Sequence, residues 1–335
     1  MKGHYNAFWH YVWYNIDNSK EWSLLALLHC KSDWYKLNLK NIRAILTSSF
    51  GYKSYNTPIR RVYIPKPNDK TKTRPEGVPP LATRIHFRKL VMVLSLILPE
   101  IISLHQHGFV PKRGIITCWK RIITLIEKLP WVYEFDLATF FDGINHKLII
   151  ETIINKFKVP RKDLKRWRKI IRISVFDKTN NTTTPTRSGM PQGLSIYPVI
   201  SILALEQSGF LEPLNDGILV QYVDDGLILS KTEKDVIKAS RDLNAISRDG
   251  IQINHEKYRI TNSKSSNIKF IGLTLSPNGV FNSTPKSGNS FTVGNINEPD
   301  VINWKHLFPS SITTSTTSPS LTSNSSLIAT ILTTK

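Results

Sequence analysis

The sequence predicts an α+β fold in which antiparallel strands carry a pair of adjacent carboxylates. Two apolar, strand-prone runs flank an acidic corner within Leu219–Ser230, and another strand-like run ends at Asp136. Helical periodicity covers residues 81–104 and 115–126. An Asp-Gly pair between two apolar runs is a strong signal for a tight hairpin turn, so we expect at least one antiparallel pair of strands with helices around it.

The acidic corner, Val223 to Gly226, is the expected tip of this hairpin. Its neighbouring carboxylates, Asp224 and Asp225, repel each other and are partly desolvated, which is unfavourable unless a cation neutralises them. Oxygen ligands on a rigid turn suit Mg²⁺. An isolated Asp-Asp-Gly is more often a solvated turn, so the metal hypothesis depends on a second acidic site.

That second site is Asp136, where a strand-like run from Trp131 hands over to a turn. A helix with an apolar face is expected from about His146. If the two strands are neighbours in one sheet, Asp136, Asp224 and Asp225 can converge on two metal ions. Such a pair of ions clamps the attacking and leaving oxygens in phosphoryl transfer.

Composition points to a polyanionic partner. The chain of 335 residues carries a formal charge of +20 and has a pI near 9.9, which suits nucleic acid first and an anionic membrane second. Its two cysteines, Cys30 and Cys118, exclude a disulfide framework and a four-cysteine zinc site. The longest apolar run, Leu90–Leu98, is too short to span a bilayer, and no membrane partner is expected.

Six segments between Pro58 and Ser276 resemble, in order, the motifs of reverse transcriptases, and the group II intron and mitochondrial retroelement enzymes are the most similar kind. Tyr222-Val223-Asp224-Asp225 resembles their Tyr-x-Asp-Asp box, and the Asp136 segment resembles their first catalytic motif. The resemblance implies a right-hand polymerase, with fingers and a palm whose antiparallel sheet holds Asp136, Asp224 and Asp225 around two Mg²⁺ ions, for which Mn²⁺ is a possible substitute.

Residues 58–280 form the expected fingers and palm domain, preceded by an aromatic-rich helical region, 1–57. Tryptophans interleaved with lysines in this N-terminal region suit either a platform for bases or a buried helical core. We favour the core. A dense basic run over 156–169, which includes Trp167, suits either a phosphate-binding face or a solvated helix, and here we favour nucleic acid.

The resemblance assigns residues to the incoming nucleotide. The basic hairpin from Pro58 to Pro79 resembles the fingers hairpin that holds the triphosphate, which makes Lys72 and Arg74 candidates. His107 to Gly114 resembles a Gly-Phe-Arg-Pro-Gly-Arg-Ser box with several departures, and it makes Arg113 another candidate.

Phe141 lies five residues after Asp136, where the family places a bulky ring that excludes a ribose 2′-hydroxyl. An ordinary core role for this ring is equally compatible with the sequence. Ser188 to Pro198 resembles the Pro-Gln-Gly motif, so Gln192 and Gly193 are expected to position nucleotide and template.

Two further motifs follow the aspartates. By the resemblance, Lys257 is a candidate general acid for the pyrophosphate leaving group. Ile271 and Gly272 lie in a segment similar to the hairpin that grips the primer end. Residues 281–335, rich in Ser, Thr and Asn, read as a disordered tail, and no helical thumb is recognisable.

The sequence thus predicts an RNA-directed DNA polymerase whose partners are an RNA template, a DNA or RNA primer, deoxynucleoside triphosphates and its own intron RNA. Two alternatives stay open: an RNA-binding intron splicing factor (a maturase) with weak or no polymerase activity, and an RNA-dependent RNA polymerase. Abundant Ile, Lys and Asn fit an AT-rich organelle genome. A chain made inside an organelle needs no transit peptide, so a mitochondrial location is expected despite the lack of a signal-like N-terminus.

Overall fold

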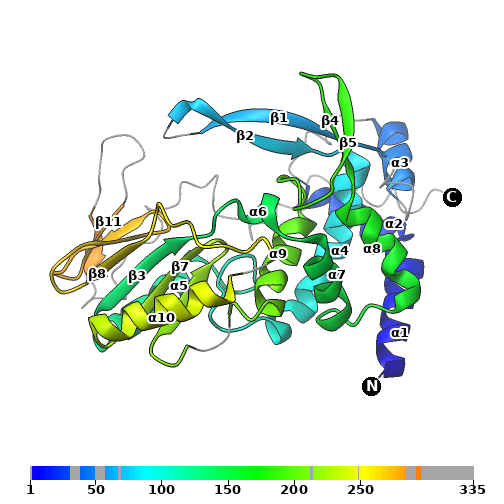
Figure 1. Ribbon diagram of the computed structural model, residues 1–335. Coiled ribbons are helices and arrows are strands. Elements are labelled where there is room, and N and C mark those ends of the chain that lie inside the picture. Colours follow the sequence, from blue (N-terminus) through cyan, green and yellow to red (C-terminus); the bar gives the residue numbers. More distant parts are fainter. Residues whose placement is uncertain are drawn as a thin grey trace. The chain divides into compact units, whose positions relative to one another are not determined.

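A computed structural model describes residues 2–30, 38–49, 57–66, 69–211, 214–247, 249–283 and 292–295. The chain divides into two compact units. The first unit comprises the chain up to Ile101 together with Phe141–Gln207, and the second comprises Ile102–Phe140 together with the chain from Ser208. Figure 1 shows the elements of both units.

The first unit combines helices with a four-stranded sheet of order β2-β1-β4-β5, in which β1 and β4 are parallel. Its strands are β1 (Ile59–Lys66), β2 (Asp69–Val78), β4 (Ser174–Asp177) and β5 (Thr182–Pro185). Its helices are α1 (Lys2–Tyr11), the π-helix Val12–Ile16, α2 (Lys20–Leu28), α3 (Leu39–Ser48), α4 (Leu81–Ile101), α7 (His146–Asn155), the 3₁₀ turn Arg161–Asp163, α8 (Leu164–Ile171) and α9 (Ile196–Gln207).

Two of the N-terminal tryptophans are core, as we favoured, and Trp22 is partly buried. Trp9 and Trp13 are buried and stack with their ring centroids 5.7 Å apart, and Trp9 donates a hydrogen bond through Nε1 to the carbonyl of Phe157 at 2.9 Å. Trp167, from the basic run, is also fully buried in this cluster. It is therefore unable to stack on a base, and only the cations around it face solvent. Trp34 lies outside the described residues.

A buried ionic cluster joins α4 to the turn after the π-helix. His86 and Lys89 have no exposed surface, and Asp17 lies between them, with its Oδ1 2.6 Å from Nδ1 of His86. Burial opposes the charge on Asp17, but His86 and Lys89 outweigh it and lower the pKa of the carboxyl. Burial lowers the pKa of Lys89 to about 8. Helical periodicity identified the helix but not which polar side chains it buries.

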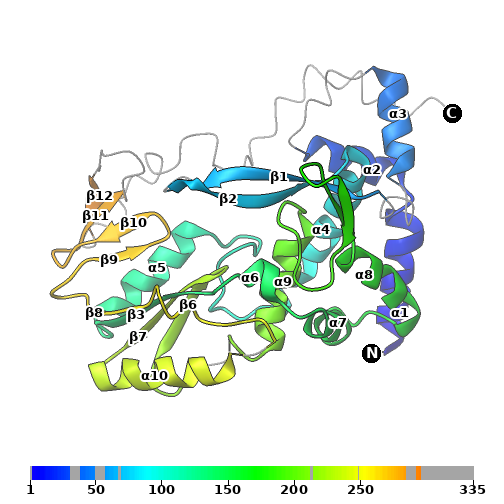
Figure 2. The same ribbon diagram turned by 45° about the horizontal axis from the view of Figure 1, so that its top comes forward.

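The second unit is built on an antiparallel sheet of order β6-β7-β3-β8. Its strands are β3 (Trp131–Asp136), β6 (Ile218–Tyr222), β7 (Asp225–Ser230) and β8 (Arg259–Asn262), and its helices are α5 (Ile115–Ile126) and α10 (Glu233–Ile246). The short helix α6 (Phe140–Gly143) spans the boundary between the units. Figure 2 shows α5 and α10 on opposite faces of the sheet.

Alternation along the strands explains this packing. Val132, Leu227 and Leu229 point to the side of α5 and share a core with Trp119 and Ile122 of that helix. On the other face α10 begins at Thr232, whose side chain accepts a hydrogen bond from the backbone N–H of Asp235, as expected for an N-cap.

A second, smaller sheet of order β12-β11-β10-β9 follows β8 in the chain. Its strands are β9 (Ile268–Phe270), β10 (Leu273–Leu275), β11 (Val280–Ser283) and β12 (Thr292–Asn295). Most of β11 and all of β12 fall in the stretch 281–335 that we expected to be disordered, so regular structure continues past residue 281. The rest of that predicted tail lies outside the described residues.

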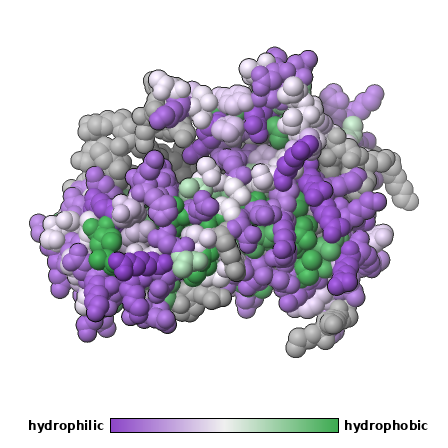
Figure 3. Space-filling view, in the orientation of Figure 1, coloured by the Kyte–Doolittle hydropathy of each residue, from purple (hydrophilic) through white to green (hydrophobic). Residues whose placement is uncertain are grey.

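Hydrophilic side chains cover most of the face drawn in Figure 3. Among the described residues, no helix is long and apolar enough to cross a membrane.

Candidate active site

The acidic corner is a hairpin, but its turn lies two residues earlier than the Asp-Gly pair suggests. β6 and β7 pair with Tyr222 opposite Asp225, so Val223 and Asp224 are the two turn residues and Asp225 already belongs to a strand. Gly226 is needed within the strand, because a Cβ there would lie 2.1 Å from the ring of Phe135 on the neighbouring strand. The positive φ of the turn, 61°, falls on Val223 instead.

Register brings the two acidic sites together. β3 and β7 are neighbours, and Asp136 is the residue directly opposite Asp225. The backbone N–H of Leu137 donates to the carbonyl of Asp224 at 3.0 Å, which ties the end of β3 to the turn. Asp136, Asp224 and Asp225 therefore lie at one end of a single antiparallel sheet, as the sequence predicted.

The carboxylates are electrostatically strained. Partial desolvation, and then the charges of Asp224 and Asp136, raise the pKa of Asp225 to about 7, although part of its side chain faces solvent. Lys257 lowers that pKa, but less strongly. Like charges held this close favour a bound cation.

Lys257 also lies at this end of the sheet. The backbone N–H of Asn254 donates to the carbonyl of Asp136 at 2.7 Å, and Leu137 and Ile253 form an isolated antiparallel bridge. Lys257 follows three residues later and contacts Oδ2 of Asp136 through its ammonium group, 2.9 Å away. The predicted general acid and the first predicted metal ligand are therefore adjacent.

The three carboxylates suit a hard divalent cation, which prefers oxygen ligands. Asp136 lies on β3, Asp225 on the neighbouring β7, and Asp224 in the turn between β6 and β7. In the described part of the chain, no three His, Cys, Asp or Glu side chains are already gathered as a metal cage. One of the three carboxylates, that of Asp136, accepts a hydrogen bond from the ammonium group of Lys257.

The predicted primer-grip residues form the turn between β9 and β10. Ile271 and Gly272 both have positive φ, 39° and 84°, as a two-residue type I′ hairpin requires. Ile271 packs partly against the same core as α5. A β-branched residue such as Ile271 rarely adopts this backbone conformation, so the turn is locally strained.

Arg113 has a structural role that the sequence did not suggest. Its Nη1 donates to the carbonyls of Ser103 and Gln106 at 2.6 and 2.8 Å, which supports the loop before α5. The predicted triphosphate contact of Arg113 stays a prediction.

The other predicted nucleotide-binding residues belong to the first unit. Lys72 and Arg74 are exposed on β2. The carbonyl of Gln192 accepts a hydrogen bond from the N–H of Gly77 at 2.6 Å, and a Cβ on Gly193 would lie 2.0 Å from the Gly77 carbonyl oxygen. β2, the strand that carries Lys72 and Arg74, therefore packs directly against the loop that contains Gln192 and Gly193.

Phe141 joins the same local structure. It is partly buried in α6, and its carbonyl accepts a hydrogen bond from the N–H of Met190 at 2.6 Å. The fingers hairpin, the Pro-Gln-Gly loop and the residue expected beside the sugar are therefore parts of one folded unit.

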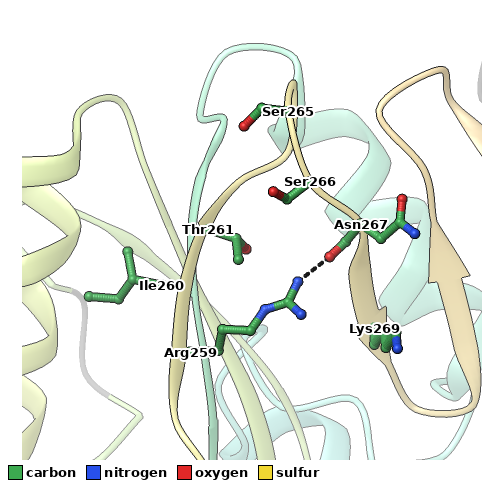
Figure 4. Close-up of a pocket in the computed structure, with 7 residues that line it drawn as sticks. All are labelled: Arg259, Ile260, Thr261, Ser265, Ser266, Asn267 and Lys269. Atoms are coloured by element: carbon green, nitrogen blue, oxygen red, sulfur yellow. Dashed lines mark hydrogen bonds between the residues drawn. The ribbon is translucent and has the colours of Figure 1, made fainter.

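A shallow cavity of about 640 Å³ lies elsewhere in the second unit, between β8 and β9. Figure 4 shows its lining residues, with Arg259 donating to the backbone carbonyl of Asn267. None of the predicted site residues lines it. Its residues are Arg259, Ile260, Thr261, Ser265, Ser266, Asn267 and Lys269.

Sequence reasoning missed two buried glutamines beside the acidic turn. Gln106 and Gln221 have no exposed surface, and both donate side-chain hydrogen bonds to the carbonyl of Val223. The available signal was a polar residue inside an apolar run: Gln221 interrupts the strand before the aspartates.

A four-stranded antiparallel sheet with paired carboxylates at its end and a helix on each face defines a polymerase palm. Residues 64–275 match the family described as reverse transcriptase (RNA-dependent DNA polymerase), and the chain belongs to this family.

Relatives and solved structures agree with this class. The chain is 28% identical over 200 residues to the group II intron-encoded protein LtrA of Lactococcus lactis subsp. cremoris, covering 59% of this chain and 32% of LtrA. It is 27% identical over 151 residues to a COX1/OXI3 intron 2 protein of Saccharomyces cerevisiae, covering 45% and 17%. The matched segments span less than half the length of these curated relatives.

Telomerase from Candida albicans, solved in complex with a fragment of telomeric RNA, superimposes with a TM-score of 0.53 at 15% identity, over 72% of this chain and 47% of that one. At this identity the likeness concerns the fold alone. The right-hand polymerase fold expected from the motifs is confirmed.

Proposed function

We propose that this chain is an RNA-directed DNA polymerase that adds deoxynucleotides to a primer 3′-hydroxyl on an RNA template. The observation that carries the proposal is the register of β3 and β7, which sets Asp136 opposite Asp225 with Asp224 in the adjoining turn. In the reaction the primer oxygen bonds to the α-phosphorus, the bond to the leaving pyrophosphate breaks, and the hydroxyl proton is lost.

Asp136, Asp224 and Asp225 would hold two divalent ions, Mg²⁺ or alternatively Mn²⁺. Bound there, the ions would lower the pKa of the hydroxyl and neutralise the triphosphate. The raised pKa of Asp225, caused first by desolvation and then by the charges of Asp224 and Asp136, supports this assignment, because a bound cation would offset both effects.

Lys257 is the proposed proton donor to pyrophosphate. Its hydrogen bond to Asp136, and the charge of that carboxylate, raise the pKa of the ammonium group, which keeps it protonated at neutral pH. A protonated amine held beside the first catalytic carboxylate is suited to supply a proton as negative charge develops on the leaving group.

Binding of the incoming nucleotide is assigned to the first unit and to Arg113. Exposed Lys72 and Arg74 would pair with the triphosphate, and Arg113 would add a further contact. Gln192 and Gly193 would position the base pair, and Phe141 would exclude a 2′-hydroxyl. Ile271 and Gly272 would contact the primer end.

The test is primer extension on an RNA template with Mg²⁺, comparing deoxynucleotides with ribonucleotides. Wild-type protein should extend with deoxynucleotides, and the double variant Asp224→Asn/Asp225→Asn should not. Ribonucleotide extension would move the assignment to an RNA polymerase. Extension that survives the double substitution would refute the role of these carboxylates.

A second function, binding of intron RNA in splicing, has its own support. Exposed cations gather around α8, at Arg161, Lys162, Lys165 and Arg168, and the matched relatives include intron-encoded proteins. Tight, salt-sensitive RNA binding that the double aspartate variant retains, without any synthesis, would favour this function over polymerisation. We propose the chain's own intron RNA as the partner and a mitochondrial location, on the strength of these relatives.

A further inference from the structure

We propose that Gln106 is a positioning residue that holds the acidic turn in its catalytic shape, and this inference rests on the proposed polymerase function. Gln106 lies far from the aspartates in sequence, in the loop before α5, and its side chain is fully buried. It contacts neither nucleotide nor metal ligand side chains in the proposed mechanism. It acts through the backbone of Val223.

The turn needs an external support. Val223 has a φ of +61°, the left-handed region, which a β-branched residue rarely adopts. Glycine is the usual residue at the first central position of a turn with this geometry. Such a conformation persists only where surrounding contacts over-determine it.

Gln106 supplies those contacts with both ends of its amide. Its Oε1 accepts hydrogen bonds from the N–H of Val223 at 2.9 Å and from the N–H of Gly108 at 2.8 Å. Its Nε2 donates to the carbonyl of Val223 at 3.4 Å. A single side chain therefore satisfies the donor and the acceptor of the strained residue.

The support is itself anchored to the sheet. The N–H of His107 donates to the carbonyl of Gln221, and the N–H of Gln221 donates to the carbonyl of His105, both at 2.8 Å. Gln106 thus pairs with the last part of β6 in a parallel bridge. Arg113 adds a hydrogen bond to the carbonyl of Gln106.

Gln221 also hydrogen-bonds to the backbone of Val223. Its Nε2 donates to the carbonyl of Val223 at 3.0 Å, so that carbonyl has two amide donors. The N–H of Val223 has Gln106 as its acceptor, and without it a buried donor would lack a partner. The hydrogen bond that Oε1 of Gln106 accepts from the N–H of Val223 is therefore the one that Gln221 does not duplicate.

Two variants separate the accepted bonds from the donated one. Gln106→Leu keeps the approximate volume and removes all of the hydrogen bonds. Gln221→Leu removes one of the two amide donors to the Val223 carbonyl and leaves the N–H of Val223 bonded to Oε1 of Gln106. Ile122→Ala, in the core of α5, is a control that perturbs the same unit away from the turn.

In primer extension, we expect Gln106→Leu to lower kcat by about a hundredfold, the loss typical of misplaced catalytic groups, with KM for the deoxynucleotide within about twofold of wild type. Gln221→Leu should lower kcat far less than Gln106→Leu does, because the Val223 carbonyl keeps the Gln106 donor and the Val223 N–H keeps its acceptor. Folding is checked by circular dichroism, and the assay is run below the unfolding temperature of every variant. An unchanged kcat in Gln106→Leu, or a loss in Ile122→Ala as large as in Gln106→Leu, would overturn the proposal.

Amide hydrogen exchange of the metal-free protein tests the same contact without activity. The peptide that covers residues 219–230 should exchange faster in Gln106→Leu than in wild type, and by more than in Ile122→Ala, which loosens only the core beneath these strands. If the wild-type protein synthesises no DNA, the proposed function fails, and exchange alone decides whether Gln106 holds the turn. Unchanged exchange in Gln106→Leu would refute the role.

Discussion

The ammonium group of Lys257 donates a hydrogen bond to Oδ2 of Asp136 across 2.9 Å, joining two residues that are 121 positions apart in the chain. Lys257 is largely exposed, so solvent screens this ion pair and its contribution to stability is small. The contact places the ammonium group of Lys257 beside the carboxylate of Asp136, the first proposed metal ligand. We therefore expect Lys257 to matter more for catalysis than for the free energy of unfolding.

Lys257→Ala should therefore lower kcat strongly and change folding little. We expect a loss of about a hundredfold or more in single-turnover extension, within the range of general acid catalysis. The free energy of unfolding should change by less than about 1 kcal/mol. Lys264→Ala, another exposed lysine in the same unit, is the matched control and should retain full activity. Normal turnover in Lys257→Ala would remove the residue from the mechanism.

Asp225→Asn should raise the unfolding temperature of the protein in EDTA, because it removes one of three carboxylates that repel each other. In wild type, Mg²⁺ should raise the unfolding temperature by binding the folded state, and this gain should be lost in the variant. Thermal unfolding with and without Mg²⁺ measures both effects. Asp242→Asn, on α10, should behave as wild type. An equal Mg²⁺ effect in Asp225→Asn would contradict the metal assignment.

Gly226→Ala should destabilise the second unit, since a Cβ at this position lies 2.1 Å from Cζ of Phe135 and the ring must move. We expect a loss of about 1–3 kcal/mol, the usual penalty for overpacking, in chemical denaturation. Gly114→Ala is the control, because a Cβ there meets nothing within 4 Å and the backbone is extended. It should stay within about 0.5 kcal/mol of wild type. Equal stability of the two variants would contradict the packing of β3 against β7.

His107 should make stability depend on pH between about 6.5 and 4. Burial, and then the charges of Arg113 and Arg121, lower its pKa from 6.5 to about 4. In this window the unfolded chain binds the proton and the folded chain does not, so the free energy of unfolding falls as the pH falls, by at most about 3 kcal/mol from this group.

His107→Gln should flatten that part of the pH profile, whereas His255→Gln, at an exposed position, should keep the wild-type slope. Chemical denaturation at a series of pH values compares the three proteins. A wild-type slope in His107→Gln would show that another group causes the dependence.

Local patterns were enough to identify several elements of this protein. Apolar, strand-prone runs predicted the strands on both sides of the acidic turn. The motifs also identified which carboxylates belong to the site, and register then placed Asp136 opposite Asp225. These features were predictable because they depend on neighbouring residues or on a pattern of chemically required side chains.

Other features were decided only by contacts between distant segments. Gly226 lies in the strand against the ring of Phe135, and the turn residue Val223 has a strained backbone that is held by a glutamine 117 residues away. Buried Lys89 has its ionic partner in Asp17, the residue that follows the π-helix. The sequence by itself determined the strands around the acidic turn and the family to which the chain belongs. Tertiary structure alone decided which polar groups are buried and which backbone positions are strained, because each such group is satisfied by a partner that no local pattern identifies.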